Sequence, residues 1–131
     1  MGGPGVMVLD TCAVLWMAFS RDKFTPSTLS KLDSASHLII NSMCFWEIDI
    51  KVKKGKLEIP ISVNELAGLY AGNTHVRIVA PDIGIILTSL ELDWKHRDPV
   101  DRIVVATAQK ENSPIVTSDK IIKKFYHPTT I

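Results

Sequence analysis

The stretch Trp94 to Asp119, WKHRDPVDRIVVATAQKENSPIVTSD, decides the fold. Asp98-Pro99-Val100-Asp101 has the form of a helix start, because aspartate is favoured at the N-cap and proline at the first helical position. Asn112 to Pro114 indicates a turn, and the apolar run Ile115 to Thr117 predicts a buried strand that delivers Asp119. The stretch therefore predicts a helix and then a strand, with acids at the helix start and after the strand.

The rest of the chain predicts strands alternating with helices. Three short apolar runs are typical of strands buried in a parallel sheet: Val6 to Asp10, His37 to Asn41 and Val76 to Val79. The predicted helices are Ala13 to Phe19, Pro26 to Ser36, Met43 to Lys54 (closed by Gly55), Val63 to Tyr70 and Asp82 to Leu92. This alternation predicts an α/β fold of three layers, α/β/α, around a mainly parallel sheet of four to five strands.

Length and composition predict one domain over residues 1–131, with residues 1–5 flexible. The 131 residues are 46% hydrophobic, which is enough for a packed core. The formal net charge of +1 provides no overall field that would attract nucleic acid, so any attraction to phosphate must be local.

Cysteine content and hydropathy predict a cytoplasmic protein. Cys12 and Cys44 are too few for a disulfide framework and lack zinc-site spacing, so both are expected to be free thiols in the core. The chain has no signal-peptide pattern and no apolar run near the roughly 18 residues of a membrane span, so no membrane association is expected.

Each of the aspartates has an ordinary structural explanation. Asp98 fits an N-cap with Asp101 in the first turn, and Asp10 and Asp119 could each cap the helix that follows them. Taken singly, capping is the better interpretation of each. Glu47 is different, because it lies within a helix among apolar neighbours, where burying an unpaired carboxylate costs several kcal/mol.

The predicted topology brings the acids together. Asp10 and Asp119 end two strands, and Glu47 and Asp101 lie in first helical turns at the same sheet edge, where sites form in parallel α/β sheets. Clustered carboxylates repel one another, so a divalent cation is their natural partner, and oxygen ligands favour Mg²⁺ or Mn²⁺. A cation of this kind suits phosphodiester hydrolysis by an activated water.

Two basic runs allow two interpretations. Lys51, Lys53, Lys54 and Lys56 form one run, and Lys120, Lys123 and Lys124 form the other. Lysines near helix ends usually face water and favour the helix dipole. The same lysines could instead hold a polynucleotide backbone.

The order and spacing of these motifs resemble the PIN domain family, and within it the VapC-type toxin ribonucleases. The matching pieces are Leu9-Asp10-Thr11, the segment from Ser42 through Trp46-Glu47-Ile48 to Leu57, Arg97 to Arg102 running into Val105 to Ala108, and Ile115 to Asp119. These pieces cover nearly the whole chain. None is specific alone, but their joint order and spacing are.

The resemblance implies more than the residues show. It implies a strand order near 3-2-1-4-5, a homodimer, and Mg²⁺- or Mn²⁺-dependent endoribonuclease activity on RNA, restrained by a cognate antitoxin. The acidic positions carry over to Asp10, Glu47, Asp101 and Asp119 as catalytic metal ligands. Thr11 and Thr117 match hydroxyl positions that in the family orient metal-bound water or a neighbouring carboxylate, and Asp98 corresponds to an auxiliary ligand or simply to the N-cap.

Other classes of function fit less well. A non-catalytic PIN module that binds RNA or assembles with a partner is the main alternative, but it gives no reason to keep all four acids. A nucleotide-binding domain needs a glycine-rich loop between a strand and a helix, whereas the glycine cluster here precedes the first strand. A receiver-type phosphoacceptor does not match the order of acids.

Overall fold

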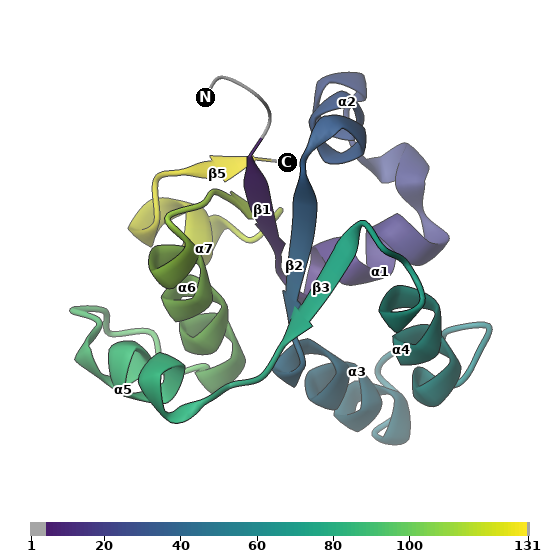
Figure 1. The fold of residues 1–131 in the computed structure, drawn as a ribbon. Coiled ribbons are helices and arrows are strands. Elements are labelled where there is room, and N and C mark those ends of the chain that lie inside the picture. The colour runs from purple at the N-terminus through teal and green to yellow at the C-terminus, as the bar shows by residue number, and fades with distance from the viewer. Residues whose placement is uncertain (1–4, 131) are drawn as a thin grey trace.

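A parallel five-stranded sheet crosses the centre of the molecule in a computed structural model that describes residues 5–130 (Figure 1). Its order is β3-β2-β1-β4-β5, and all four strand pairs are parallel. The strands are β1 (Val6–Leu9), β2 (His37–Asn41), β3 (Val76–Val79), β4 (Ile115–Val116) and β5 (Thr129–Thr130). The predicted α/β fold and strand order are confirmed. Residues 1–5 were expected to be flexible, and residues 1–4 of that segment lie outside the described range.

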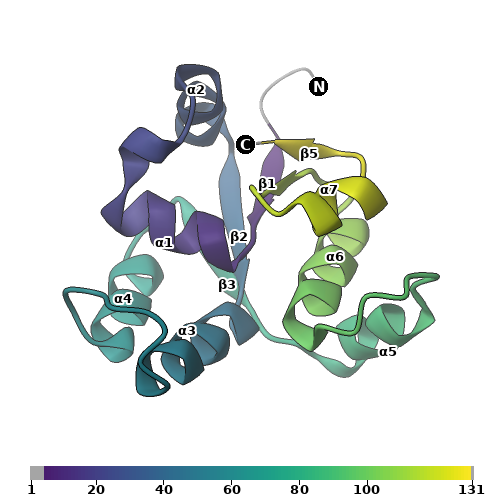
Figure 2. The same cartoon turned by 180° about the vertical axis from the view of Figure 1, so that it is seen from behind.

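Helices cover both faces of this sheet, with α5 and α6 on one side and α1 and α4 on the other (Figures 1 and 2). The helices are α1 (Thr11–Phe19), η1 (Arg21–Lys23), α2 (Pro26–Ser34), α3 (Met43–Lys53), α4 (Val63–Ala71), α5 (Ile83–Glu91), α6 (Pro99–Glu111) and α7 (Lys120–Phe125). Predicted and observed bounds differ by a few residues at most. Helix α2 ends earlier than predicted because the Ser36 amide donates to the Gly5 carbonyl beside the sheet.

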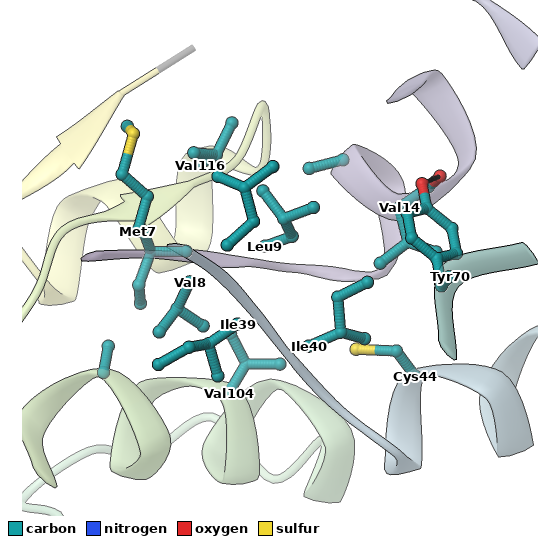
Figure 3. Close-up of a cluster of buried hydrophobic side chains, with 14 of the residues drawn as sticks. Met7, Val8, Leu9, Val14, Ile39, Ile40, Cys44, Tyr70, Val104 and Val116 are labelled. Atoms are coloured by element: carbon teal, nitrogen blue, oxygen red, sulfur yellow. Dashed lines mark hydrogen bonds between the residues drawn. The ribbon is translucent and has the colours of Figure 1, made fainter. Parts of the chain in front are cut away.

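The core forms on both faces of β1, as the continuous apolar runs predict. Val8 faces α6 with Ile39 and Val104, whereas Leu9 faces the opposite layer with Val116 (Figure 3). All five of these side chains are at most 1% exposed. Successive residues of a strand point to opposite faces, so a strand covered on both faces needs apolar residues throughout.

Helix ends follow the local sequence. Thr25 accepts from the Thr28 amide at the start of α2, with Pro26 in the first turn. Gly55, with φ of 71°, ends α3 in the left-handed conformation that glycine adopts without strain. Asn112 has φ of 51° and ends α6 in the same conformation, which turns the chain towards β4.

Two composition-based expectations can be compared with the structure. Cys12 and Cys44 are both free thiols, as predicted, but only Cys44 is buried, because Cys12 lies half-exposed beside Ser118. Among residues 5–130, none of the helices has the length and apolar character required to cross a membrane.

Arg102 holds the segment between α5 and α6. Its guanidinium donates to the Ser89 carbonyl at 2.7 and 3.1 Å, and to the Leu92, Trp94 and His96 carbonyls at 3.1, 2.7 and 2.9 Å. One rigid five-donor group thus joins the last turn of α5 to three carbonyls of the following segment, which forms no regular structure. This fixes the loop that enters α6.

We expect Arg102→Lys to lower the free energy of unfolding by about 2 kcal/mol, because an ammonium group cannot reach all four carbonyls and an unpaired, partly buried carbonyl costs about 1–3 kcal/mol. Urea denaturation followed by circular dichroism measures the change. Arg97→Lys on the exposed side of the same loop is the control and should change stability by less than about 0.5 kcal/mol. Equal effects of both substitutions would contradict the role of Arg102.

Candidate active site

The candidate site lies at the carboxyl edge of β1 and β4, where the strand order reverses. The two strands are neighbours in the sheet, yet the chain leaves β1 for β2 on one side and returns to β4 on the other. No helix of a connecting segment closes the gap above such a pair, so side chains that follow the strands converge there. Asp10 follows β1, and Thr117 and Asp119 follow β4.

Asp10 is the buried carboxylate of the site, with 4% of its surface exposed. Its Oδ1 accepts from the Ala13 amide at 2.8 Å, and its Oδ2 accepts a short hydrogen bond from the Thr117 hydroxyl. Burial raises the pKa of the Asp10 carboxyl to about 6, although both hydrogen bonds act in the opposite direction. The charges of Asp101 and Asp119 add to this increase in pKa, so the three acids are electrostatically coupled.

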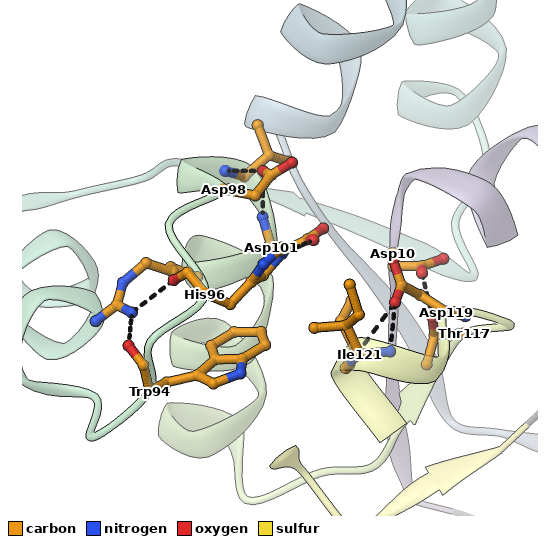
Figure 4. A network of polar contacts seen from close by, with 11 residues as sticks. Asp10, Trp94, His96, Asp98, Asp101, Thr117, Asp119 and Ile121 are labelled. Atoms are coloured by element: carbon orange, nitrogen blue, oxygen red, sulfur yellow. Dashed lines mark hydrogen bonds and ion pairs between the residues drawn. The ribbon is translucent and has the colours of Figure 1, made fainter. Parts of the chain in front are cut away.

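Asp119 is held on the other strand by the same threonine. The Thr117 hydroxyl oxygen accepts from the Asp119 amide at 2.9 Å, so one side chain joins both strand ends (Figure 4). Asp119 Oδ1 accepts from the Ile121 and Ile122 amides at 2.7 and 3.3 Å and caps α7. Its Oδ2 forms no hydrogen bond with residues 5–130 and is free to bind a ligand.

The start of α6 supplies two further acids. Asp98 Oδ1 accepts from the Val100 and Asp101 amides at 2.9 and 3.1 Å, which makes Asp98 the N-cap. Asp101 Oδ2 lies 2.6 Å from His96 Nε2 (Figure 4). Burial raises the pKa of Asp101 to about 6 against the opposing effect of the His96 bond, and the neighbouring charges of Asp98 and Asp119 raise it further.

His96 was not predicted from the sequence, although it lies in the closest cluster of possible ligands. Within the described range 5–130, potential ligand atoms of His96, Asp98 and Asp101 all lie within 4.8 Å of one another, and no other group of at least three does. Only its position two residues before Asp98 marked it in the sequence. The Arg102 bond to its carbonyl places the imidazole beside Asp101.

Glu47 does not lie where the sequence suggested. The expectation that it is buried among apolar residues is wrong: Glu47 is half-buried, because only Cys44 and Ile48 on the neighbouring helix face are fully covered. It lines a cleft together with Asp98 and Lys51. Asp10, and not Glu47, is therefore the buried carboxylate whose negative charge needs a partner. Glu47 lies at the margin of the cluster, near enough to raise the pKa of the Cys44 thiol.

The residues present fit a divalent cation. Asp98 Oδ2, Asp101 Oδ1 and Asp119 Oδ2 form no hydrogen bonds with the described residues, and all three are hard oxygen donors. The Thr11 hydroxyl, next to Asp10, is buried without a hydrogen-bond partner of good geometry in residues 5–130 and lies beside the Cys44 thiol. A water or an ion bound at the site would satisfy this hydroxyl.

Capping and ligand binding are compatible in this arrangement. The predicted caps at Asp10, Asp98 and Asp119 are all confirmed. Asp98 and Asp119 each cap through Oδ1 alone, which leaves the second oxygen available and fixes the direction in which it points. Helix capping thus explains how the carboxylates are oriented and does not replace a role in binding.

Comparison with known proteins gives relatives of similar length. The chain is 22% identical over 126 residues to Ribonuclease VapC22 from Mycobacterium tuberculosis (strain ATCC 25618 / H37Rv), with 95% of each chain covered. Two solved structures share the fold. A toxin-antitoxin complex from Klebsiella pneumoniae gives a TM-score of 0.64 at 17% identity, and VapBC2 from Rickettsia felis bound to a DNA fragment from its promoter gives 0.66 at 14% identity. In both, the match covers 95% of this chain and 96% of the other.

A family assignment follows from the match over the whole fold. Residues 7–128 match the PIN domain, a range that begins in β1 and ends just before β5 and so includes every acid of the candidate site. The chain therefore belongs to the PIN domain family.

Proposed function

We propose that residues 1–131 act as one nuclease domain, a divalent-metal-dependent endoribonuclease that is the toxin of a toxin-antitoxin pair. The observation that carries the proposal is the convergence of Asp10, Asp101 and Asp119 at the switch point of the sheet: Thr117 bonds to both Asp10 and the Asp119 amide, and the charge of Asp119 raises the pKa of Asp10 and of Asp101. The relative named a ribonuclease and the fold shared with toxin-antitoxin complexes support it.

In this proposal Asp10, Glu47, Asp101 and Asp119 hold Mg²⁺ or Mn²⁺, and Thr11, Asp98 and Thr117 support them. When bound, the cation supplies the activation of water and the neutralisation of phosphate charge that phosphodiester hydrolysis needs. Thr117 keeps the Asp10 carboxylate in one orientation, and the His96 bond does the same for Asp101. Glu47 lines the cleft between α3 and the start of α6, together with Asp98.

Covalent catalysis by cysteine does not fit the site. Burial raises the pKa of the Cys44 thiol to about 12, and burial also raises the pKa of Cys12. Both therefore remain thiols at neutral pH, whereas a nucleophilic cysteine needs a thiolate. Attack by water is the remaining route among these groups.

The main alternative is a non-catalytic PIN-fold module that binds RNA or assembles with a partner. Such a module has no use for a carboxylate that is buried at the cost seen for Asp10. The antitoxin proposal is separate from catalysis, and it rests on the fold shared with the structure named a toxin-antitoxin complex and with VapBC2.

We expect Asp10→Asn and Asp101→Asn to reduce cleavage of single-stranded RNA at least about 1,000-fold while leaving the fold as stable as before or more stable, because each removes one of several repelling charges. A fluorogenic RNA assay with Mg²⁺ or Mn²⁺ and with chelator measures the loss. Asp33→Asn on exposed α2 is the matched control and should leave cleavage unchanged. Cleavage by either site variant, or by the wild type in excess chelator, would contradict the proposal.

The metal-free protein should become less stable as the pH rises from about 4 to about 6. Asp10 and Asp101 have a pKa of about 6 in the folded chain, against about 3.9 in an unfolded one, so between these values the folded state binds more protons. Raising the pH removes those protons and the stability they provide. Urea midpoints measured in chelator across this range test the slope, which Asp10→Asn should reduce. Mg²⁺ should restore more stability at pH 7 than at pH 5. A flat profile would contradict the coupling.

We further propose a homodimer that forms through α5. From the sequence, the apolar helix Ala13 to Phe19 with Trp16 was the first candidate for this surface, with a core role for Trp16 equally open; Trp16 packs edge-on against Phe24 at 5.3 Å and contributes to the core. On α5, Ile83, Leu87 and Leu90 are 70, 51 and 69% exposed and recur at helical spacing. A second copy of the same apolar face would cover them.

We expect Leu87→Glu to convert the dimer into a monomer, because the substitution places a charge in the centre of the proposed interface. Sedimentation velocity at micromolar concentration measures the change. Leu69→Glu on α4 changes a leucine that is even more exposed, at 67%, and lies outside this face, so it should leave the dimer intact. A wild-type protein that sediments only as a monomer would remove this interface.

A further inference from the structure

Two clefts with basic and aromatic linings flank the carboxylates, one on each side. The first lies between the segment that precedes α6 and helix α7, and its lining includes Trp94, Lys95, His96, Lys120 and Lys124. The second lies between α3 and the start of α6, and its lining includes Trp46, Lys51, Lys54, Lys56 and Asp98. Each cleft ends at an acid of the site: His96 of the first contacts Asp101, and Glu47 and Asp98 line the second.

The first cleft has a volume of about 750 Å³ and a preorganised aromatic wall. The rings of Trp94 and Phe125 stack with 4.5 Å between centroids and 10° between planes, and His96 lies 4.9 Å from Trp94. Arg102 donates to the Trp94 carbonyl and so fixes the backbone from which the indole projects, while the stack with Phe125 holds the ring itself. Ile121 adds an apolar side chain that is half-exposed at the opening.

The second cleft, of about 320 Å³, contains the exposed Trp46. This indole lies on α3 with 54% of its surface exposed, although burial of a large aromatic side chain would be favourable. Lys51, Lys54 and Lys56 lie along the same cleft. An exposed aromatic ring among cations matches the pattern with which proteins bind single strands, stacking on bases and pairing with phosphates.

The structure also divides each of the two lysine runs. Lys53 is turned away from its run, because it forms an ion pair with Asp49 at 2.7 Å and is absent from the cleft lining that contains Lys51 and Lys54. Lys123 similarly does not line the first cleft, whereas Lys120 and Lys124 do. Each run thus contains lysines that line a cleft and lysines that do not.

We propose that a single RNA strand lies across the site from one cleft to the other, with its phosphates on the cleft lysines and bases stacked on Trp46 and Trp94. This proposal rests on the proposed nuclease function and adds to it the residues of this chain that hold the strand on either side of the bond to be cut. Bases in a duplex are stacked on one another and cannot reach either indole.

Binding of a fluorescently labelled single-stranded RNA to the Asp10→Asn chain tests the lysines without cleavage. We expect Lys54→Ala and Lys124→Ala each to weaken binding about three- to tenfold and to reduce the slope of log affinity against log salt by about 0.7, the value for one phosphate contact with a single strand. Lys53→Ala and Lys123→Ala remove the same charge from the same runs and should leave affinity and slope nearly unchanged. Equal effects of all four substitutions would overturn the proposal.

Two measurements test stacking. Trp46→Ala, at an exposed position that the fold does not need, should weaken binding roughly five- to a hundredfold. RNA that carries 4-thiouridine should crosslink under ultraviolet light to peptides containing Trp46 and Trp94, a readout that needs no substitution at the packed Trp94. Duplex RNA that binds as tightly as single-stranded RNA, or crosslinks confined to other peptides, would overturn the proposal.

The experiments can show the strand path to be wrong without affecting the nuclease proposal, and the reverse. If wild-type protein cleaves RNA but the lysine and Trp46 variants bind and cleave as it does, the strand path is wrong and the proposed function stands. If the variants lose affinity as expected but the wild type cleaves nothing, the strand path is supported and the nuclease proposal fails. Unchanged RNA affinity together with lost binding of the antitoxin would assign the clefts to a protein partner and overturn the strand path.

Discussion

The short bond between the Thr117 hydroxyl and Asp10 is the interaction on which the site depends. It joins the ends of β1 and β4, two strands separated by about a hundred residues of chain that become neighbours only when the parallel sheet is complete. The same hydroxyl accepts from the Asp119 amide, so a single side chain fixes both carboxylates relative to the sheet. The register of β1 with β4 thereby sets the geometry of the acids.

This geometry has an energetic cost that the local structure offsets only in part. Burial raises the pKa of Asp10, and the two hydrogen bonds that it accepts lower it. The effect of burial is larger, so the pKa remains raised to about 6. A carboxylate that served only as a helix cap would be more stable near the surface, where water reduces repulsion from Asp101 and Asp119. Strain of this electrostatic kind is typical of sites that bind a cation or perform chemistry.

The sequence predicted the sheet, its helices and the acids at strand ends, because those features are encoded locally by apolar runs, turns and caps. It could not predict how far Glu47 is buried. Glu47 lies between Trp46, which is exposed, and Ile48, which is buried, and helical spacing alone does not decide whether such a residue faces the core or the solvent. His96 was missed for a related reason: its contact with Asp101 depends on Arg102 gathering the carbonyls of an irregular loop. Composition and periodicity do not predict side-chain contacts within an irregular loop.

The charges of the two clefts and of the site between them must be considered together. Lysines on both sides attract the phosphates of a strand, but Asp10, Asp101 and Asp119 repel the phosphate that would lie in the middle. Because the chain as a whole carries a formal charge of only +1, no distant excess of positive charge offsets this repulsion. A divalent cation held by these carboxylates would neutralise most of their charge, so in the proposed arrangement the ion that would support hydrolysis would also reduce the repulsion in the middle of the strand path. A module that only bound RNA would bind it more tightly with neutral residues in place of these acids.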